Sequence, residues 1–466
     1  MRSTPTFDAL CAPLGEVCGD LGARGGDVSA LATEQTSLAI VIDDRKQDVS
    51  EPPLLRGIVL RAFDGEGFQE YATDGAPRAE LHRAARRLGR IARRSGAERG
   101  SGGETFDTPC AIDPADLPLE EKFSRVRDLH ARVRALHPRG VNARVIYRES
   151  IQLERFQTPS CVLTQRVVRV IAAALLFVAE NGRTEYVYVS KGGTRGVELL
   201  RFDPAELDRI RETASAMLGA ERIEPGTYDV VTSPEASGLI AHEAFGHGVE
   251  MDMYPKGRAR SQLYLGKRVA SPLVTMLDDP SVPGAHGSFF FDDEGHRARP
   301  TTIIRDGIYT GGLADDSAAL QLGYPPTPNG RRESYRRKAY ARMTNTFFAP
   351  GGRGPHARSA AATPEALIAG VDRGIYLDQG SSGMEDPKSW GIQVTMRNAR
   401  EIRSGKLTDR HFKEVGVTGY VPEVLGSISA VANDLELDPG TCGKGHKELV
   451  PVSSGGPHLR LVARLS

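Results

Sequence analysis

The first half of the chain is patterned mostly as strands. Residues 38–42 and 57–63 are rich in aliphatic residues, and Asp64-Gly65 directly after them is a hairpin signal. Residues 141–200 have the same character over a longer stretch, and Asn181-Gly182 within them predicts a second hairpin turn. The pattern therefore predicts antiparallel sheet built from consecutive strands.

Helical periodicity interrupts these strands in three places. Residues 78–94 and 118–137 carry apolar side chains at helical spacing. A capping box, Asp203-Pro204-Ala205-Glu206, begins a third helix that ends near Gly219. The first helix is rich in arginine, which would suit nucleic acid. A solvated helix face is the better interpretation, because basic and acidic residues are equal in number along the chain.

Composition shifts along the chain suggest its domain organisation. Residues 1–36 show little periodicity, so we expect a poorly ordered segment there. We expect an N-terminal α+β domain over 37–219 and a C-terminal domain over 220–466, which is rich in glycine and holds every chemical motif. Residues 347–360 and 377–390 are too polar for a core and predict long loops. The predicted fold class is α+β, with helices and large antiparallel β-meander sheets.

Composition also limits the kind of protein. Lys plus Arg and Asp plus Glu each number 60 in 466 residues, so no overall charge draws the chain to nucleic acid or to a membrane surface. The longest apolar run, 170–179, is well short of the ~18 residues that a transmembrane helix needs, and the N-terminus lacks the apolar core of a secretory signal. Five scattered cysteines argue against a disulfide framework. We therefore expect a cytoplasmic protein that binds neither nucleic acid nor membrane.

A candidate metal site begins at His242, where the sequence reads HEAFGH. A short strand at 228–231 comes before it, followed by Ser233 as a candidate N-cap and Pro234 at the first helical position. His242 and His247 are five residues apart, which places them ~140° apart on a regular helix, whereas the spacing of HExxH gives ~40°. A regular α-helix therefore cannot present both imidazoles to one ion.

Two local distortions would bring the histidines together. The helix can take a π-type turn, which is frequent at functional sites, or it can end at Gly246 so that His247 turns back from an irregular segment. Gly246 and Gly248 flank His247 and tolerate the dihedral angles that either distortion needs. The extra residue thus predicts a distorted helix and does not exclude a metal.

Two imidazoles alone would hold zinc weakly, since catalytic zinc usually has three protein ligands and an open position for water. Residues 438–452 offer two further donors, Cys442 in a glycine-rich turn and His446, and a thiolate suits zinc. Glu243 is placed to accept a proton from zinc-bound water and to pass one to the leaving amine. Glu250 could orient a ligand histidine or simply lie exposed at a helix end.

The string HExxxH also arises by chance, and a lone histidine is more often a surface or hydrogen-bonded core residue. Four motifs that follow one another along the chain are far more specific than HExxxH alone. They are HEAFGHGVE, FDDEG at 291–295, MTNTFFAPG at 343–351, and GTCGKG with PVSSGGPHLRL between 440 and 461. Together they resemble the TldD/PmbA family of peptidases over most of residues 228–466.

This resemblance implies a zinc site. The family's ligands map onto His242, His247 and Cys442, which is the reason to prefer Cys442 to His446, and its catalytic glutamate maps onto Glu243. The chain departs from the family at His446-Lys447, where a glutamine usually lies nearby, and in the Gly- and Arg-rich loop 351–358. Both departures concern the surface that faces the substrate.

The resemblance also implies an activity and partners. Family members cleave unfolded peptides, including ribosomally made precursor peptides, inside a chamber that an extended chain could enter by strand addition to a sheet edge. They work as dimers, often of a zinc-bearing TldD-like chain with a metal-free TldE/PmbA-like relative. We therefore expect a zinc-dependent peptidase that forms a homodimer or such a heterodimer. The alternatives are a catalytically inactive metal-binding subunit of a heterodimer and a regulatory interaction protein.

Two further motifs each have two interpretations. Asp292-Asp293-Glu294-Gly295 could bind a cation or form a polar turn before a strand at 301–304. Asn345-Thr346 could donate hydrogen bonds to a substrate backbone or satisfy neighbouring loop amides. We assign neither motif a catalytic role.

Overall fold

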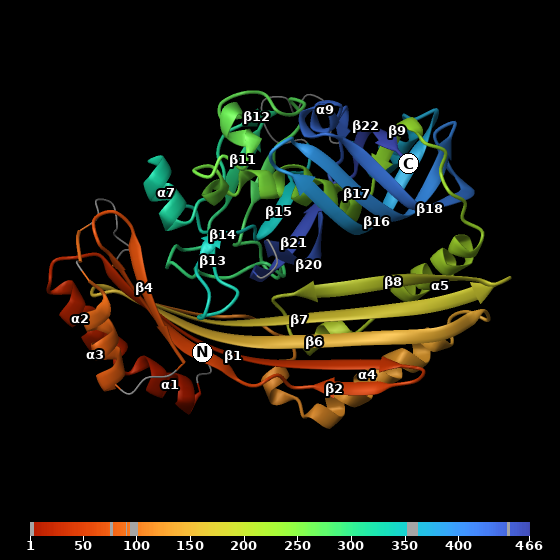
Figure 1. Cartoon of the computed structure of the whole chain (residues 1–466). Coiled ribbons are helices and arrows are strands. Elements are labelled where there is room, and N and C mark those ends of the chain that lie inside the picture. Colours follow the sequence, from red (N-terminus) through yellow and green to blue (C-terminus); the bar gives the residue numbers. More distant parts are fainter. Residues whose placement is uncertain (1–3, 75–77, 90, 94–100, 352–361, 445–447) are drawn as a thin grey trace.

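The computed structural model describes residues 4–74, 78–89, 91–93, 101–351, 362–444 and 448–466 of the chain. Figure 1 shows a large, twisted sheet formed by the N-terminal part of the chain, with the C-terminal sheets and loops lying against it. Mixed helices and mostly antiparallel sheets make up both parts. The predicted α+β fold class is therefore confirmed.

The N-terminal part contains one eight-stranded sheet, in which the strand order is β4-β3-β1-β6-β7-β5, with β2 paired to β1 and β8 to β7. Its strands are β1 Val28–Asp43, β2 Gln47–Ser50, β3 Leu55–Phe63, β4 Phe68–Thr73, β5 Gly102–Asp107, β6 Gly140–Gln157, β7 Cys161–Glu180 and β8 Arg183–Gly193. Its helices are α1 Pro5–Cys11, α2 Leu14–Gly22, α3 Arg78–Arg87, α4 Leu119–Arg134 and α5 Pro204–Leu218.

The predicted local signals of this part are confirmed. Asn181 and Gly182 take positive φ values of 49° and 76° and form the turn between β7 and β8. Asp203 and Glu206 form a reciprocal capping box at the start of α5. Helices α4 and α5 pack against the sheet. Their apolar stripes meet alternate residues of β6 and β7, and together they form one core.

The expectation of a poorly ordered segment at 1–36 is wrong for the residues that the structure describes. Helices α1 and α2 and the first half of β1 lie within it. Phe7, Leu14 and Val17 are fully buried against β1 and β3. The two helices have seven and nine residues, too short to show a clear period, so tertiary packing stabilises them more than propensity does.

The C-terminal part contains two six-stranded sheets, ordered β12-β11-β10-β15-β21-β20 and β18-β17-β16-β9-β22-β19, and a two-stranded ribbon of β13 and β14. The strands are β9 Gly226–Thr232, β10 Met276–Asp278, β11 Thr301–Arg305, β12 Ile308–Tyr309, β13 Gly330–Arg331, β14 Tyr340–Ala341, β15 Asn345–Phe348, β16 Arg373–Asp386, β17 Gly391–Arg403, β18 Lys406–Tyr420, β19 Ala430–Val431, β20 Glu436–Lys444, β21 Glu448–Gly456 and β22 Leu459–Leu465. The helices are α6 Pro234–Ala241, α7 Asp316–Leu322, α8 Pro364–Ala369 and α9 Val421–Gly426.

The loop predicted at 377–390 is wrong, because β16 runs through most of it and pairs with β17 as far as Asp386. Residues 381–384 are exposed although they belong to a strand, so their polarity does not indicate a loop. For the loop predicted at 347–360, residues 347–348 belong to β15, while residues 352–360 lie outside the described part of the chain.

Buried ion pairs connect the two parts. The guanidinium of Arg61 on β3 lies 2.7 Å from a carboxylate oxygen of Glu294 and 2.7 Å from one of Asp316, and 3.2 Å from one of Glu70. Arg332 completes the cluster by pairing with Glu70. Along the sequence, β8 is the last strand of the eight-stranded sheet and β9 is the first strand of the C-terminal sheets. A domain boundary near residue 220 stays a prediction.

No helix in the described ranges is both long enough and apolar enough to span a bilayer.

Candidate metal centre

The segment that carries the two histidines begins as the sequence predicts. Strand β9 ends at Thr232, and the Ser233 hydroxyl accepts a hydrogen bond from the Ala236 N–H, which caps α6. The helix then widens into a π-helical turn over His242–Gly246. The first of the two predicted distortions is therefore confirmed: an i→i+5 turn brings residues five positions apart onto one side.

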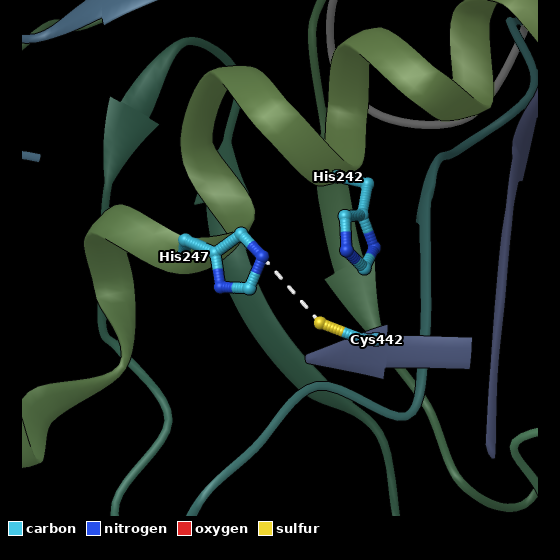
Figure 2. Close-up of side chains that lie close together, drawn as sticks. All are labelled: His242, His247 and Cys442. Atoms are coloured by element: carbon cyan, nitrogen blue, oxygen red, sulfur yellow. Dashed lines mark hydrogen bonds between the residues drawn. The ribbon is translucent and has the colours of Figure 1, made fainter. Parts of the chain in front are cut away.

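The structure brings His242, His247 and Cys442 together (Figure 2). One ligand atom from each lies within 4.8 Å of the other two. The Cys442 Sγ atom is 3.4 Å from His247 Nε2, and the two imidazole rings are 5.1 Å apart between centroids, edge to face. Cys442 is 4% exposed and His242 8%, so the three side chains meet in a largely buried place.

Close packing of α6 on the β20–β21 hairpin explains how Cys442 reaches the histidines. Cys442 lies opposite Val450 in this hairpin, and β21 runs parallel to β15 in the same sheet. A Cβ atom built at Gly238 of α6 would lie 2.4 Å from the Gly455 backbone nitrogen of β21. Only glycine permits this approach, which holds the helix directly against the strand pair that carries the cysteine.

The polar surroundings of Cys442 and His247 favour a thiolate. Burial alone would raise the pKa of the Cys442 thiol, but hydrogen bonds with His242 and His247 and the charge of His247 lower it to about 5. Burial would likewise lower the pKa of His247, but its contacts with Cys442 and Glu250 raise it well above the ordinary value. Without a metal, a proton shared in this cluster sits on the imidazole; a metal ion would replace that proton.

Glu250 orients the His247 ring through the ring nitrogen that does not face Cys442. Its Oε2 atom lies 3.3 Å from His247 Nδ1, so the Nε2 atom of the same ring faces Cys442. Burial would raise the pKa of Glu250, but Lys444, His247 and Arg342 hold it well below its ordinary range. Arg342 also donates a hydrogen bond of 3.0 Å to the Cys442 carbonyl. Of the two interpretations of Glu250, the structure supports the orienting one, since Glu250 is 1% exposed.

Sequence reasoning missed two side chains that hold the residue after His247. The Gly248 N–H donates a 2.8 Å hydrogen bond to Glu385 Oε2, and Ser261 donates one to the Gly248 carbonyl. Glu385 lies in β16, within the segment expected to be a loop. Its sequence context, MEDP, gives no signal, because the contact depends on how β16 passes the π-helical turn.

Glu243 is the second residue of the π-helical turn and is partly buried. Strand β16 passes directly beside it: a Cβ atom built at Gly383 would lie 2.3 Å from Glu243 Cγ. The Glu243 carboxylate is also close enough to Glu385 to raise the pKa of that residue, after the larger effect of burial. His446, the competing third ligand, lies outside the described residues.

The other two motifs are satisfied within the protein. Asp292 accepts backbone hydrogen bonds from Glu294, His296 and Gly330 at 2.8–3.0 Å, as a polar turn does. The Asn345 side chain accepts from Gly287 N–H and donates to the carbonyl of Asp279. Each motif therefore has a structural role in positioning loops.

The donors at the histidine–cysteine cluster fit a metal ion. Two imidazoles and a thiolate form a ligand set typical of zinc with one position left open. His242 Nδ1 is buried and has no hydrogen-bond partner among the described residues. His247, in contrast, already has its Nδ1 atom held by Glu250.

Comparison with known proteins shows which family the chain resembles. Residues 225–464 match the family model described as the PmbA/TldA metallopeptidase C-terminal domain. A metalloprotease of Methanothermobacter thermautotrophicus is 32% identical over 375 residues, which is 79% of each chain. A metalloprotease TldD homolog of Haemophilus influenzae is 31% identical over 430 residues, 87% of this chain and 85% of that protein. The names of these relatives imply a metal.

Solved structures share the fold. A Thermotoga maritima protein named as a candidate modulator of a DNA gyrase superposes with a TM-score of 0.74 at 17% identity, over 96% of this chain and 99% of that one. TldE of Thermococcus kodakarensis gives 0.68 at 14% identity, over 96% and 99%. The matched family model and the extent of the sequence similarity lead to one conclusion: this chain belongs to the TldD/PmbA family of metallopeptidases.

Proposed function

We propose that this protein is a zinc-dependent peptidase in which His242, His247 and Cys442 hold the metal and Glu243 is the general base. The observation that carries the proposal is the convergence of one ligand atom from each of these three side chains within 4.8 Å. The hydrolysis of a peptide bond needs a strong nucleophile and a polarised carbonyl. Zinc supplies both when bound, because it lowers the pKa of water and acts as a Lewis acid.

The chain's own residues then have defined tasks. Glu243 accepts the proton that the attacking water loses and delivers a proton to the amine nitrogen that leaves. Glu250 keeps the Nε2 atom of His247 directed at the metal position through its contact with Nδ1. Arg342 balances the charge of Glu250, from which its Nε atom is 3.2 Å away. These assignments support hydrolysis over a purely structural metal site, which would be closed by a fourth protein ligand.

Strand β16 supports an extended peptide as the substrate. Its hydrogen bonds to β9 end at Leu377, while its pairing with β17 continues to Asp386. Among the described strands, none pairs with the other edge of β16 between Asp378 and Asp386, and Glu243 packs on a face of this same stretch at Gly383. An unfolded peptide, such as a ribosomally made precursor, could add there as a strand and place its backbone beside the catalytic glutamate.

A second candidate function is a metal-binding subunit that needs a partner for activity. The solved TldE neighbour favours a partnership of this kind. We propose that the chain assembles as a homodimer or as a heterodimer with a metal-free relative, and that the cytoplasm is its compartment.

The test compares the zinc-loaded wild-type protein with the Glu243→Gln variant on an unfolded, quenched fluorescent peptide. The variant should bind zinc with unchanged stoichiometry and lose about 10²- to 10⁴-fold in hydrolysis rate. Hydrolysis retained by Glu243→Gln would remove Glu243 from the mechanism. A zinc-bound wild-type protein that cleaves only after a metal-free relative is added would establish the second candidate function.

A further inference from the structure

A polar cavity of about 250 Å³ lies between the N-terminal sheet and the C-terminal loops. The sheet contributes Glu154 and Arg169, the loops contribute Asp293 and Arg331, and Val450 of the Cys442 hairpin closes one side. None of His242, Glu243, His247 and Cys442 lines it. The cavity is therefore a separate feature from the metal centre, although both use the same hairpin.

Two buried guanidinium groups face this cavity without a carboxylate partner in contact. Arg169 is 5% exposed and Arg331 6%. Arg169 donates its hydrogen bonds to neutral oxygens, the carbonyls of His286 and Ser288 and the side-chain amide of Gln152. Arg331 donates a 2.7 Å hydrogen bond to the Met343 carbonyl. Within the described chain, neither guanidinium has a carboxylate oxygen within 4.0 Å.

The charge of these two arginines is compensated only at a distance, by Asp293 for both and by Glu154 for Arg169. Burial and the nearby Arg169 hold the pKa of Arg331 below its ordinary value, and burial does the same for Arg169. A buried ion without a partner costs several kcal/mol, and an anion of matching shape recovers part of that cost. A planar carboxylate fits a guanidinium through two parallel hydrogen bonds.

The opposite charge is present in the same cavity. Glu154 is 4% exposed, its two carboxylate oxygens accept hydrogen bonds from the side-chain amides of Gln152 and Gln165, and the charge of Asp293 lies nearby. Burial and the charge of Asp293 raise the pKa of Glu154. Two neighbouring buried carboxyl groups repel one another when both are ionised, and a cationic ligand near both would relieve that repulsion.

Apolar surface completes the lining. Phe289, Phe291 and Val450 border the cavity and are 8%, 1% and 2% exposed. The Phe289 ring lies below the Arg331 guanidinium, 5.4 Å from centroid to Cζ. The cavity therefore presents a cationic, an anionic and an apolar surface within the space of one small ligand.

We propose that this cavity binds a free α-amino acid with an apolar side chain. The α-carboxylate faces Arg169 and Arg331, the α-ammonium faces Glu154 and Asp293, and the side chain packs on Phe289 and Val450. The proposal does not rest on peptide hydrolysis, because no residue assigned to the metal centre lines the cavity.

The test is isothermal titration of the zinc-loaded full chain with L-leucine, leucinamide and isocaproate. L-leucine should bind with a Kd below about 1 mM. Leucinamide lacks the carboxylate and isocaproate lacks the ammonium, so each should bind at least about tenfold more weakly, since each leaves buried charges unpaired. Absence of L-leucine binding up to about 10 mM would overturn the proposal, as would equal affinity for all three compounds.

Variants separate this cavity from the metal centre. Arg331→Gln should weaken L-leucine binding at least about tenfold. Ser150→Leu fills the cavity from the sheet side, where Ser150 is only partly buried, and should weaken binding even if Arg331→Gln proves unstable. His242→Ala, which should lose zinc, should bind L-leucine as the wild type does. L-leucine binding that is lost in His242→Ala and kept in both cavity variants would mean that the ligand sits on the metal, which contradicts the proposal.

Discussion

The Sγ atom of Cys442 lies 3.4 Å from Nε2 of His247, although 195 positions separate the two residues in the sequence. The contact depends on two features of the fold. The π-helical turn His242–Gly246 directs both histidines to one side, and the glycine contact between α6 and β21 at Gly238 brings the cysteine hairpin against that side. The candidate metal centre thus lies where α6 and the β20–β21 pair approach so closely that position 238 admits only glycine.

Glu385 is predicted to position His247 by holding the Gly248 N–H. Glu385→Ala removes this acceptor, and zinc affinity should fall about 10- to 100-fold, as it does when groups that orient metal ligands are removed. Glu385→Gln keeps an acceptor oxygen and should retain most of the affinity. Competition with a chelating dye measures both. Glu414→Ala is the control, because Glu414 is exposed on the surface; a Glu385→Ala protein that binds zinc like this control would rule out the positioning role.

Gly248 is predicted to tolerate no side chain. A Cβ atom at this position would lie 2.3 Å from Glu385 Oε1, so Gly248→Ala must displace the buried Glu385 carboxylate, which accepts the hydrogen bond of the Gly248 N–H. We expect a loss of about 1–3 kcal/mol in the free energy of unfolding and weaker zinc binding. Thermal unfolding with and without zinc measures both effects.

The matched control is Gly19→Ala in α2, where nothing lies within 4 Å of the added methyl group. That change should stabilise the protein slightly or leave it unchanged, because alanine favours helix over glycine. Equal behaviour of the two variants would show that the turn at Gly248 is not tightly packed.

Arg61 is predicted to hold the two parts of the chain together. Arg61→Leu leaves the buried carboxyl groups of Glu294 and Asp316 without their guanidinium. It should lower the free energy of unfolding by about 3–5 kcal/mol at neutral pH. Arg222→Leu removes an exposed ion pair with Glu414 and should cost less than about 1 kcal/mol. Denaturant unfolding compares the two variants.

The loss in free energy of unfolding caused by Arg61→Leu should depend on pH. Burial already raises the pKa of Glu294 to about 8 with Arg61 in place, and removing the guanidinium raises it further. A carboxyl group whose pKa is higher in the folded than in the unfolded state binds more protons when folded, so stability falls as pH rises between the two pKa values. The two folded proteins bind different numbers of protons only above about pH 8, so the loss of stability in Arg61→Leu should be smaller near pH 7 than near pH 9; a loss that grows on acidification would contradict this account.

Much of the candidate site could be predicted from local sequence. The five-residue spacing of His242 and His247 is incompatible with a regular helix, and it therefore predicted a distorted helix, with the π-helical turn as one of two possible forms. Choosing Cys442 as the third ligand needed the family resemblance, because spacing alone left His446 open. Glu385 and Arg342 could not be found in this way, because their contacts depend on how distant strands pass the turn.

The fold, too, could be predicted where its signals are local and not where it depends on packing between distant segments. Hairpin and capping signals at Asn181-Gly182 and Asp203–Glu206 act within a few residues, so they could be recognised from sequence. Helices α1 and α2 were missed, because their burial against β1 and β3 gives short segments an order that their own pattern does not indicate. Strand β16 was missed because its residues 381–384, Ser-Ser-Gly-Met, are exposed and lack the alternation of a half-buried strand.

X-ray absorption at the zinc edge tests the central claim most directly, applied to the zinc-loaded wild type and to Cys442→Ser. We predict one sulfur and two imidazole nitrogens around a single zinc in the wild type, with the sulfur signal absent from Cys442→Ser and the zinc bound more weakly. A wild-type zinc surrounded only by nitrogen and oxygen would contradict the assignment of His242, His247 and Cys442 to one ion.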